Sequence, residues 1–250
     1  MTRIGREDRA AEGTQRTFAR IAGLMYLWLI VTDMAGALTI SRIVGSGSIA
    51  ETTGRVVASE HLYRVALCSE LIECLSVVLL AFALYVTLRP VNQLLAQIAL
   101  YWKLGESFIS GVMMIFGFMT LRLYISPQSF GALGTGQTQA LMDLVGHATS
   151  DAYNIQAIFF SIGSVLFFYL FFKSRCIPRI LSAFGVFASI SVTITCFASL
   201  IFPEHASTLQ YGWAPIGLAE LITGFWLMIF AVKTQVDTDR QSPQPEVISS

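Results

Sequence analysis

Six long apolar stretches limit what this chain can fold into more than any other feature of its sequence. They run over residues 18–42, 62–88, 91–120, 151–172, 180–201 and 213–232. A helix needs about 20 apolar residues to cross a hydrocarbon core of about 30 Å, and every stretch meets that length. The sequence therefore predicts an all-α membrane protein, with a single bundle of six transmembrane helices over residues 18–232.

The composition agrees with a chain that lives in a lipid bilayer. Of the 250 residues, 54% are apolar and only 13% are charged, whereas soluble domains average about 25% charged residues. The formal net charge is zero, so no single-sign field exists to attract nucleic acid. The four cysteines form no Cys-x-x-Cys pair, and no disulfide framework is expected.

The segments outside the spans have the polar composition of tails and loops. Residues 1–17 are expected to form a disordered or loosely helical tail, residues 233–250 a disordered tail, and residues 43–60 a loop. The longest connection, residues 125–146, is expected to hold a short surface helix in its second half. Most Lys and Arg residues fall on the side of the two tails, which predicts that both termini are cytoplasmic.

The first apolar stretch is expected to stay in the protein as a span. Ala35-Gly36-Ala37 resembles a signal-peptidase site, but Asp33 would interrupt that site and the leader would be long. The lipid bilayer is accordingly the expected surrounding of all six stretches.

Ionisable residues inside two of these stretches indicate where function resides. Glu70 and Glu73 share one helix face, and Lys103 and Glu106 share a face of the following helix. A charge within the bilayer costs roughly 2.5–3.5 kcal/mol on insertion scales, so such residues are functional candidates by default.

Geometry predicts that these two helices bring their charges together. Arg89-Pro90 ends the first helix, and the short turn makes the two helices antiparallel neighbours. At 1.5 Å of rise per residue, Lys103 comes out level with Glu70 and Glu73. We therefore expect a Lys–Glu pair across the seam, which would offset the desolvation cost of both groups.

Two further intramembrane acids and all three histidines fall toward the same side of the predicted bundle. Asp33 and Glu220 lie at a depth similar to that of the first four groups, and His61, His147 and His205 lie at the outer rim. The inner half is almost uncharged. The sequence thus predicts a polar pocket that faces outward above a sealed cytoplasmic floor.

The candidate ligand-binding residues are the ionisable groups of that pocket: Asp33, Glu70, Glu73, Lys103, Glu106 and Glu220. A structural ion-pair network that fixes helix packing is the alternative. The surplus of acids over the single lysine favours a ligand, ion or proton site, because uncompensated acids must be protonated, solvated or bound to a cation.

A metal site and an enzyme active site have less support in the sequence. His61, His147 and His205 are candidate metal ligands, but they belong to three separate loops and no His-Glu-x-x-His pattern exists. No serine stands in a nucleophile-elbow context, so no residue is assigned a catalytic role. No cofactor is expected.

Four stretches together resemble a known family. They are Arg64 with Glu70 and the run to Leu88-Arg89-Pro90; the run from Tyr101 to Glu106; the run from Tyr169 to Arg179 with its Lys-Ser-Arg-x-Ile-Pro-Arg pattern; and Ala219-Glu220-Leu221 with Trp226-Leu227. Over residues 18–232 the chain resembles a bacterial membrane family known as domain of unknown function 4386. One departure is Lys103, where an arginine is more usual, which argues against a bidentate carboxylate clamp. The resemblance implies a bacterial multi-pass membrane protein and carries no known activity.

Three functional hypotheses follow from these features. The first is a membrane protein that binds a small ligand or cation in an outward-facing pocket, in transport or sensing. The second is an intramembrane metal-dependent hydrolase that uses the rim histidines. The third is a structural subunit whose helices associate with a membrane partner.

Overall fold

The computed structural model describes residues 4–125 and 135–230, and this part of the chain forms helices and turns without a strand. The long helices are α1 (Ile4–Val44), α3 (Glu60–Leu88), α4 (Gln93–Ile125), α5 (Thr135–Ser174), α6 (Arg179–Ile201) and α8 (Ala214–Phe230). The short elements are α2 (Ile49–Ala58), η2 (Pro203–His205), α7 (Ala206–Leu209) and η3 (Gln210–Trp213).

Six helical stretches among the described residues are long and apolar enough to cross a membrane, which confirms the predicted fold class of a six-span helical bundle. The proposed tail over residues 233–250 and most of the glycine-rich part of the long connection lie outside the described residues.

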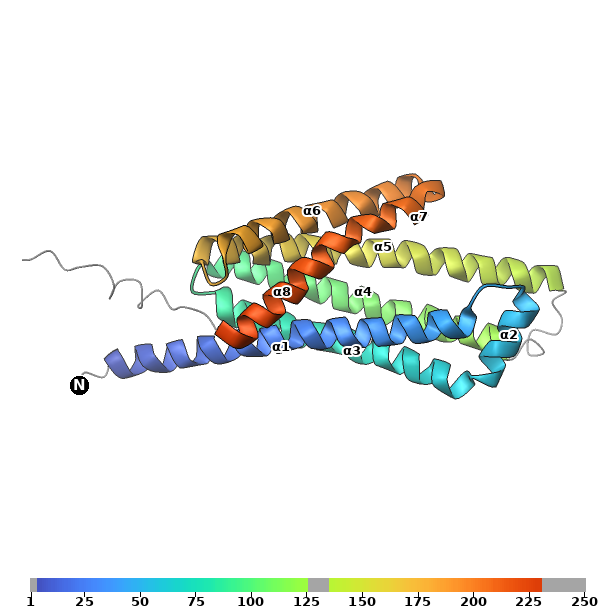
Figure 1. Ribbon diagram of the computed structural model, residues 1–250, viewed down its shortest axis with the longest axis horizontal. Coiled ribbons are helices and arrows are strands. Elements are labelled where there is room, and N and C mark those ends of the chain that lie inside the picture. Colours follow the sequence, from blue (N-terminus) through green and yellow to red (C-terminus); the bar gives the residue numbers. More distant parts are fainter. Residues whose placement is uncertain (1–3, 126–134, 231–250) are drawn as a thin grey trace, which may run out of the picture.

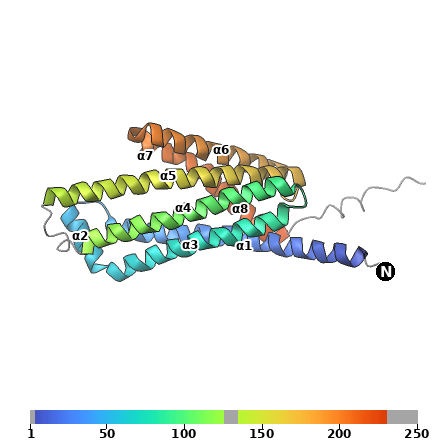
Figure 2. The same ribbon diagram turned by 180° about the vertical axis from the view of Figure 1, so that it is seen from behind.

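The six long helices contact one another in a ring. Along the chain, α1 packs on α3, α3 on α4, α4 on α5 and α5 on α6, and α8 then packs on both α6 and α1. Figure 1 shows α8 crossing the bundle diagonally from α7 to α1, and Figure 2 shows α3, α4 and α5 side by side on the opposite face. This ring leaves a central space that several helices can line.

Two glycines let the ring close. A Cβ atom on Gly23 of α1 would lie 2.7 Å from the carbonyl oxygen of Gly224 and 2.7 Å from the backbone nitrogen of Met228 in α8. Because both neighbours are backbone atoms, only a residue without a side chain fits there. Small residues commonly permit such close approach between membrane helices.

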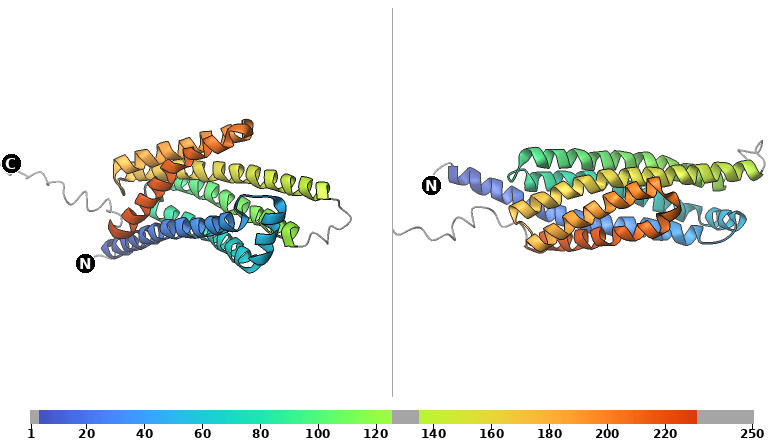
Figure 3. Two further views of the ribbon diagram at one scale, coloured as in Figure 1. Left: turned by 45° about the vertical axis from the view of Figure 1, so that its right-hand side comes forward. Right: turned by 90° about the horizontal axis from the view of Figure 1, so that it is seen from above.

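The turn between α3 and α4 is short, as predicted, and makes the two helices antiparallel neighbours (Figure 3). The backbone N–H of Val91 donates to the carbonyl of Leu88 at 3.0 Å, and the Asn92 side chain accepts from the N–H of Leu95 at 3.0 Å, which caps the start of α4. We call the end of the bundle that holds this turn the Arg89 end, and the opposite one the α2 end.

The predicted loop over residues 43–60 is wrong in one respect, because most of it forms helix α2. Ser48 and Glu51 form a capping box at its start, with the Glu51 carboxylate accepting from the N–H of Ser48 at 3.1 Å. Arg55 then donates to the carbonyls of Ile43 at 3.2 Å and Val44 at 2.6 Å, which caps the end of α1. These bonds fix α2 across the end of the bundle.

Two helices also extend beyond the predicted spans. The sequence predicted a separate short helix before a span starting at residue 151, whereas α5 runs without interruption from Thr135. Helix α1 begins at Ile4, so residues 4–17, for which disorder and loose helix were both considered, are helical. Arg, Glu and Ala make up seven of these fourteen residues, and all three favour a helix.

The Arg89 end of the bundle is filled by apolar side chains. Buried members of this core include Leu84 and Leu88 of α3, Phe167 and Phe171 of α5, and Leu227 of α8. Polar side chains buried at this end, such as Thr87 and Ser182, donate to backbone carbonyls one helical turn away. The sealed floor of the polar pocket stays a prediction, which this mainly apolar core supports.

Candidate functional site

A cavity of about 560 Å³ lies inside the ring, within the size range of ligand pockets in proteins. Its walls come from α1, α3, α4, α5, η3 and α8. All six candidate residues line it: Asp33, Glu70, Glu73, Lys103, Glu106 and Glu220. The structure thus brings together charges that the sequence places on four different helices.

Lys103 and Glu106 form an ion pair at the deep end of the cavity. The Nζ atom of Lys103 lies 2.9 Å from Oε2 of Glu106, and the exposed fractions of the two side chains are 2% and 5%. The same Nζ atom lies 4.0 Å from the centre of the Phe160 ring on α5, within the range of a cation–π contact. The lysine is therefore held by a carboxylate and an aromatic face.

The expected ion pair between Lys103 of α4 and a glutamate of α3 is wrong. Within the described residues, the ion pair of Lys103 is with Glu106 of its own helix, at i and i+3. That spacing already places the two side chains on one face.

Gly163 of α5 makes room for the lysine, because a Cβ there would lie 3.2 Å from Cγ of Lys103. Gly36 of α1 does the same for Glu70, whose Cγ would lie 2.9 Å from an added Cβ.

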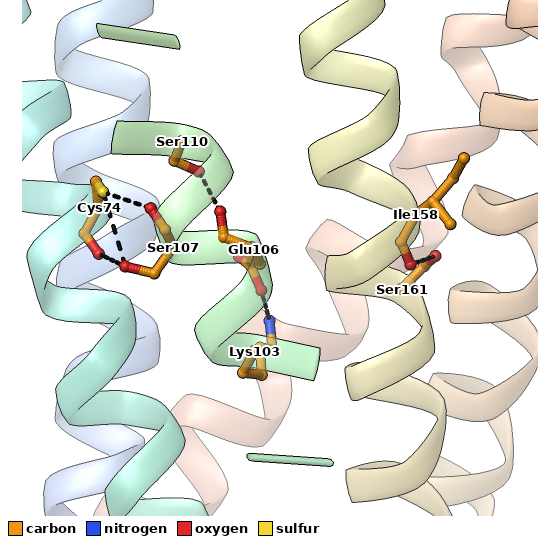
Figure 4. A network of polar contacts seen from close by, with 7 residues as sticks. All are labelled: Cys74, Lys103, Glu106, Ser107, Ser110, Ile158 and Ser161. Atoms are coloured by element: carbon orange, nitrogen blue, oxygen red, sulfur yellow. Dashed lines mark hydrogen bonds and ion pairs between the residues drawn. The ribbon is translucent and has the colours of Figure 1, made fainter. Parts of the chain in front are cut away.

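The seam between α3 and α4 is instead joined by a serine and a cysteine (Figure 4). The hydroxyl of Ser107 donates to the carbonyl of Cys74 at 2.8 Å, and the thiol of Cys74 donates to the carbonyl of Ser107 at 3.0 Å. Ser110 of α4 lines the cavity, with its hydroxyl donating to the backbone carbonyl of Glu106 at 3.0 Å. The reciprocal bonds lock the register of α3 against α4.

The remaining acids of the cavity have no basic partner of their own among the residues that the structure describes. Asp33 of α1 acts electrostatically on Glu70 and Glu73 of α3 and on Glu220 of α8. Lys103 attracts Glu73 and Glu220 as well as its close partner. The Oε1 atom of Glu220 is buried and has no hydrogen bond. One ammonium group thus faces five carboxyl groups on the described lining.

The acids differ in how far they lie from the surface. Asp33 is exposed, Glu70 and Glu73 are half-buried, and Glu106 is only 4% exposed. The cavity therefore reaches the surface beside Asp33, and its charge pair lies at the far end. We call the part beside Asp33 the mouth of the cavity.

Aromatic and amide side chains complete the walls, and these were not predicted as site residues. Tyr26 comes from α1, Tyr153, Gln156 and Phe160 from α5, and Trp213 from η3. The three α5 residues follow at i, i+3 and i+7, which places them on one helix face. The sequence did contain a signal for this wall. Gln156 is a neutral amide inside an apolar stretch, and the aromatic residues Tyr153 and Phe160 flank it at helical spacing.

The candidate metal ligands do not come together. Among the described residues there is no group of three or more His, Cys, Asp or Glu side chains placed to hold a metal ion, so His61, His147 and His205 share no such site. His205 lies 3.3 Å from the neighbouring carboxylate of Glu204, with more than half of both side chains exposed. The geometry therefore gives no support to a hydrolase that uses the rim histidines.

The chemistry that this arrangement suits is the binding of positive charge. Carboxyl groups in excess of basic groups, in a cavity walled by aromatic rings, favour a cation over an anion or a neutral molecule.

A family profile with the description Domain of unknown function (DUF4386) matches residues 21–231. No curated protein and no solved structure matches the chain.

Proposed function

The chain belongs to the DUF4386 family, and we propose that this multi-pass membrane protein binds a small cation in the cavity of its helix ring, in transport or sensing. The observation that carries the proposal is the excess of carboxyl groups on the cavity wall over its single ammonium group. A charge inside a membrane protein is costly, and a set of uncompensated acids is stabilised by bound positive charge.

The acids divide into two roles in this proposal. Glu106 is engaged with Lys103, so this pair shapes the deep end of the cavity. Within the described part of the chain, Asp33, Glu70, Glu73 and Glu220 have no such partner, and they are the proposed cation ligands. Their positions on α1, α3 and α8 would let one bound cation tie three helices together.

The location of the apolar core supports access from one side. Leu84, Leu88 and Phe171 fill the ring at the Arg89 end, whereas the mouth beside Asp33 lies toward the α2 end. Basic residues such as Arg89, Lys173 and Arg175 gather near the Arg89 end, so the positive-inside rule supports a cytoplasmic location for it. With that orientation the cavity faces outward and both termini are cytoplasmic.

The proposal is tested by the stability of the purified full chain in detergent micelles. Melting temperature is measured against rising concentrations of sodium, potassium, calcium and n-butylammonium chlorides, with N-methylglucamine chloride holding the ionic strength constant. A ligand that binds only the folded state at 100 times its Kd stabilises that state by about 2.7 kcal/mol. We expect at least one of the four cations to raise the melting temperature, and Glu73→Gln to remove most of that rise.

Glu204→Gln is the matched control, because that carboxylate lies outside the cavity and its side chain is 62% exposed. It should respond to cations as the unchanged protein does. The proposal fails if none of the four cations raises the melting temperature, or if Glu73→Gln responds like the control.

A further inference from the structure

One wall of the cavity is a continuous row of three aromatic rings. Trp213 of η3 stacks on Tyr153, with ring centres 5.3 Å apart and an interplanar angle of 29°. Trp213 also stacks on Phe160 of the same α5 helix, at 6.0 Å and 14°. The tryptophan therefore lies between two α5 rings, one toward the mouth and the other toward the deep end.

The deep half of this wall already holds an alkylammonium group, supplied by the chain itself. The Lys103 side chain ends in four methylene groups and an ammonium, which lies 4.0 Å from the Phe160 ring centre and 2.9 Å from the Glu106 carboxylate. An ammonium is held there by one carboxylate and one aromatic face.

The half of the wall near the mouth also combines an aromatic face with carboxylates. The Tyr153 ring is extended by Trp213, and Asp33 and Glu73 line the same cavity as these two rings. Lys103 is the single basic residue among the described residues that line the cavity. It is already paired with Glu106 at the deep end. Asp33 is exposed and Tyr153 is 45% exposed, so a ligand can reach both.

We infer that the Tyr153–Trp213 face, with Asp33 and Glu73, binds a primary alkylammonium ion in the manner in which Phe160 and Glu106 hold Lys103. The inference rests on the proposed function and specifies its ligand class. The carboxylates take the charge and the N–H donors, and the aromatic face takes the methylene groups and the remaining positive charge. The Gln156 amide, on the same face of α5, offers a further polar contact to the ligand.

The test uses n-butylammonium, which reproduces the Lys103 side chain, as the probe. Binding of radiolabelled n-butylammonium to the full chain in micelles is measured by equilibrium dialysis, with 1-butanol and potassium as competitors. We expect saturable binding that excess 1-butanol does not displace. Tyr153→Leu and Asp33→Asn should each weaken it about tenfold, the range of a lost cation–π or charged contact.

Matched controls are available on helix α5. Tyr169→Leu removes an exposed tyrosine away from the cavity, and Asp151→Asn removes an exposed acid two residues before Tyr153. Both should bind n-butylammonium with unchanged affinity. Each variant is accepted only if its melting temperature without the probe stays close to that of the unchanged chain, and Tyr153→Phe, which keeps the ring, should retain binding.

The possible failures are distinguishable. If sodium, potassium or calcium stabilises the protein through Glu73 while n-butylammonium does not bind, the proposed function stands and the alkylammonium inference is overturned. Binding of n-butylammonium that Tyr153→Leu and Asp33→Asn leave intact also overturns the inference, because the ligand then lies elsewhere. If no cation binds at all, both proposals fall.

Discussion

Removing one member of the Lys103–Glu106 pair should destabilise the protein far more than removing both. In Glu106→Gln the ammonium stays buried, at 1% exposure for the whole lysine residue, after losing a carboxylate 2.9 Å away. At an effective dielectric constant of about 20, that attraction is roughly 6 kcal/mol before desolvation is counted. Breaking a buried pair on one side costs about 3–5 kcal/mol in measured cases.

We place the expected cost of Glu106→Gln near the lower limit, about 3 kcal/mol. The reason is that Glu73 and Glu220 also attract Lys103 and partly replace the lost carboxylate. The double variant Lys103→Met/Glu106→Gln removes both charges and keeps similar volumes. It should be within about 1 kcal/mol of the unchanged protein, because replacing a whole buried pair is often neutral.

The assay is a double-mutant cycle on the free energy of unfolding, measured by circular dichroism in mixed micelles with rising SDS. The half-buried pair Glu60–Arg64 serves as the control, since its oxygen and nitrogen lie 2.7 Å apart but its side chains are 35% and 43% exposed. Its coupling energy should stay below about 1 kcal/mol. A coupling for Lys103 and Glu106 as small as that of the control would refute the reasoning.

Three further predictions concern helix packing and capping, and their stability changes are read from the same unfolding assay. Gly23→Ala should lower stability by about 1–3 kcal/mol, because its Cβ meets the backbone of α8, whereas Gly13→Ala on the same helix meets nothing within 4 Å and should be neutral or stabilising. Gly36→Ala should change stability by less than about 1 kcal/mol, because the flexible Glu70 side chain can move away, yet it should shift the cation response measured by melting temperature. Arg55→Ala should cost about 2 kcal/mol and speed hydrogen exchange in α2, since it leaves the carbonyls of Ile43 and Val44 without these donors; unchanged exchange would contradict that role.

Much of the fold could be predicted because the bilayer sets helix length. The apolar runs located all six spans, and Arg89-Pro90 located the tight antiparallel turn between α3 and α4. The Ser48–Glu51 capping box was visible in the sequence as Ser-x-x-Glu, but the glycines around it favoured a loop interpretation. Helix α5 was divided in two for a similar reason, because polar residues before residue 151 were read as a connection, whereas no proline interrupts residues 135–151.

Only those features of the site that depend on a single helix could be predicted from the sequence. The ionisable residues were identifiable because charges are rare in apolar helices. The partner of Lys103 was not, since a carboxylate one turn away and another across the seam were both within reach, and the choice depends on space beside Gly163. The aromatic wall depends on how α5 rotates and on where η3 lies, and no local pattern in the sequence determines either.

The most direct test of the account asks whether the acids face a water-filled cavity or the lipid. In a Cys68→Ser background, Glu73→Cys and Leu75→Cys are treated in intact cells with the cationic, membrane-impermeant reagent 2-(trimethylammonium)ethyl methanethiosulfonate. The two positions lie on the same helix at nearly the same depth, but Glu73 lines the cavity and Leu75 is 62% exposed on the outside of the bundle. The account predicts rapid modification of Glu73→Cys and none of Leu75→Cys, whereas equal behaviour of the two would contradict it.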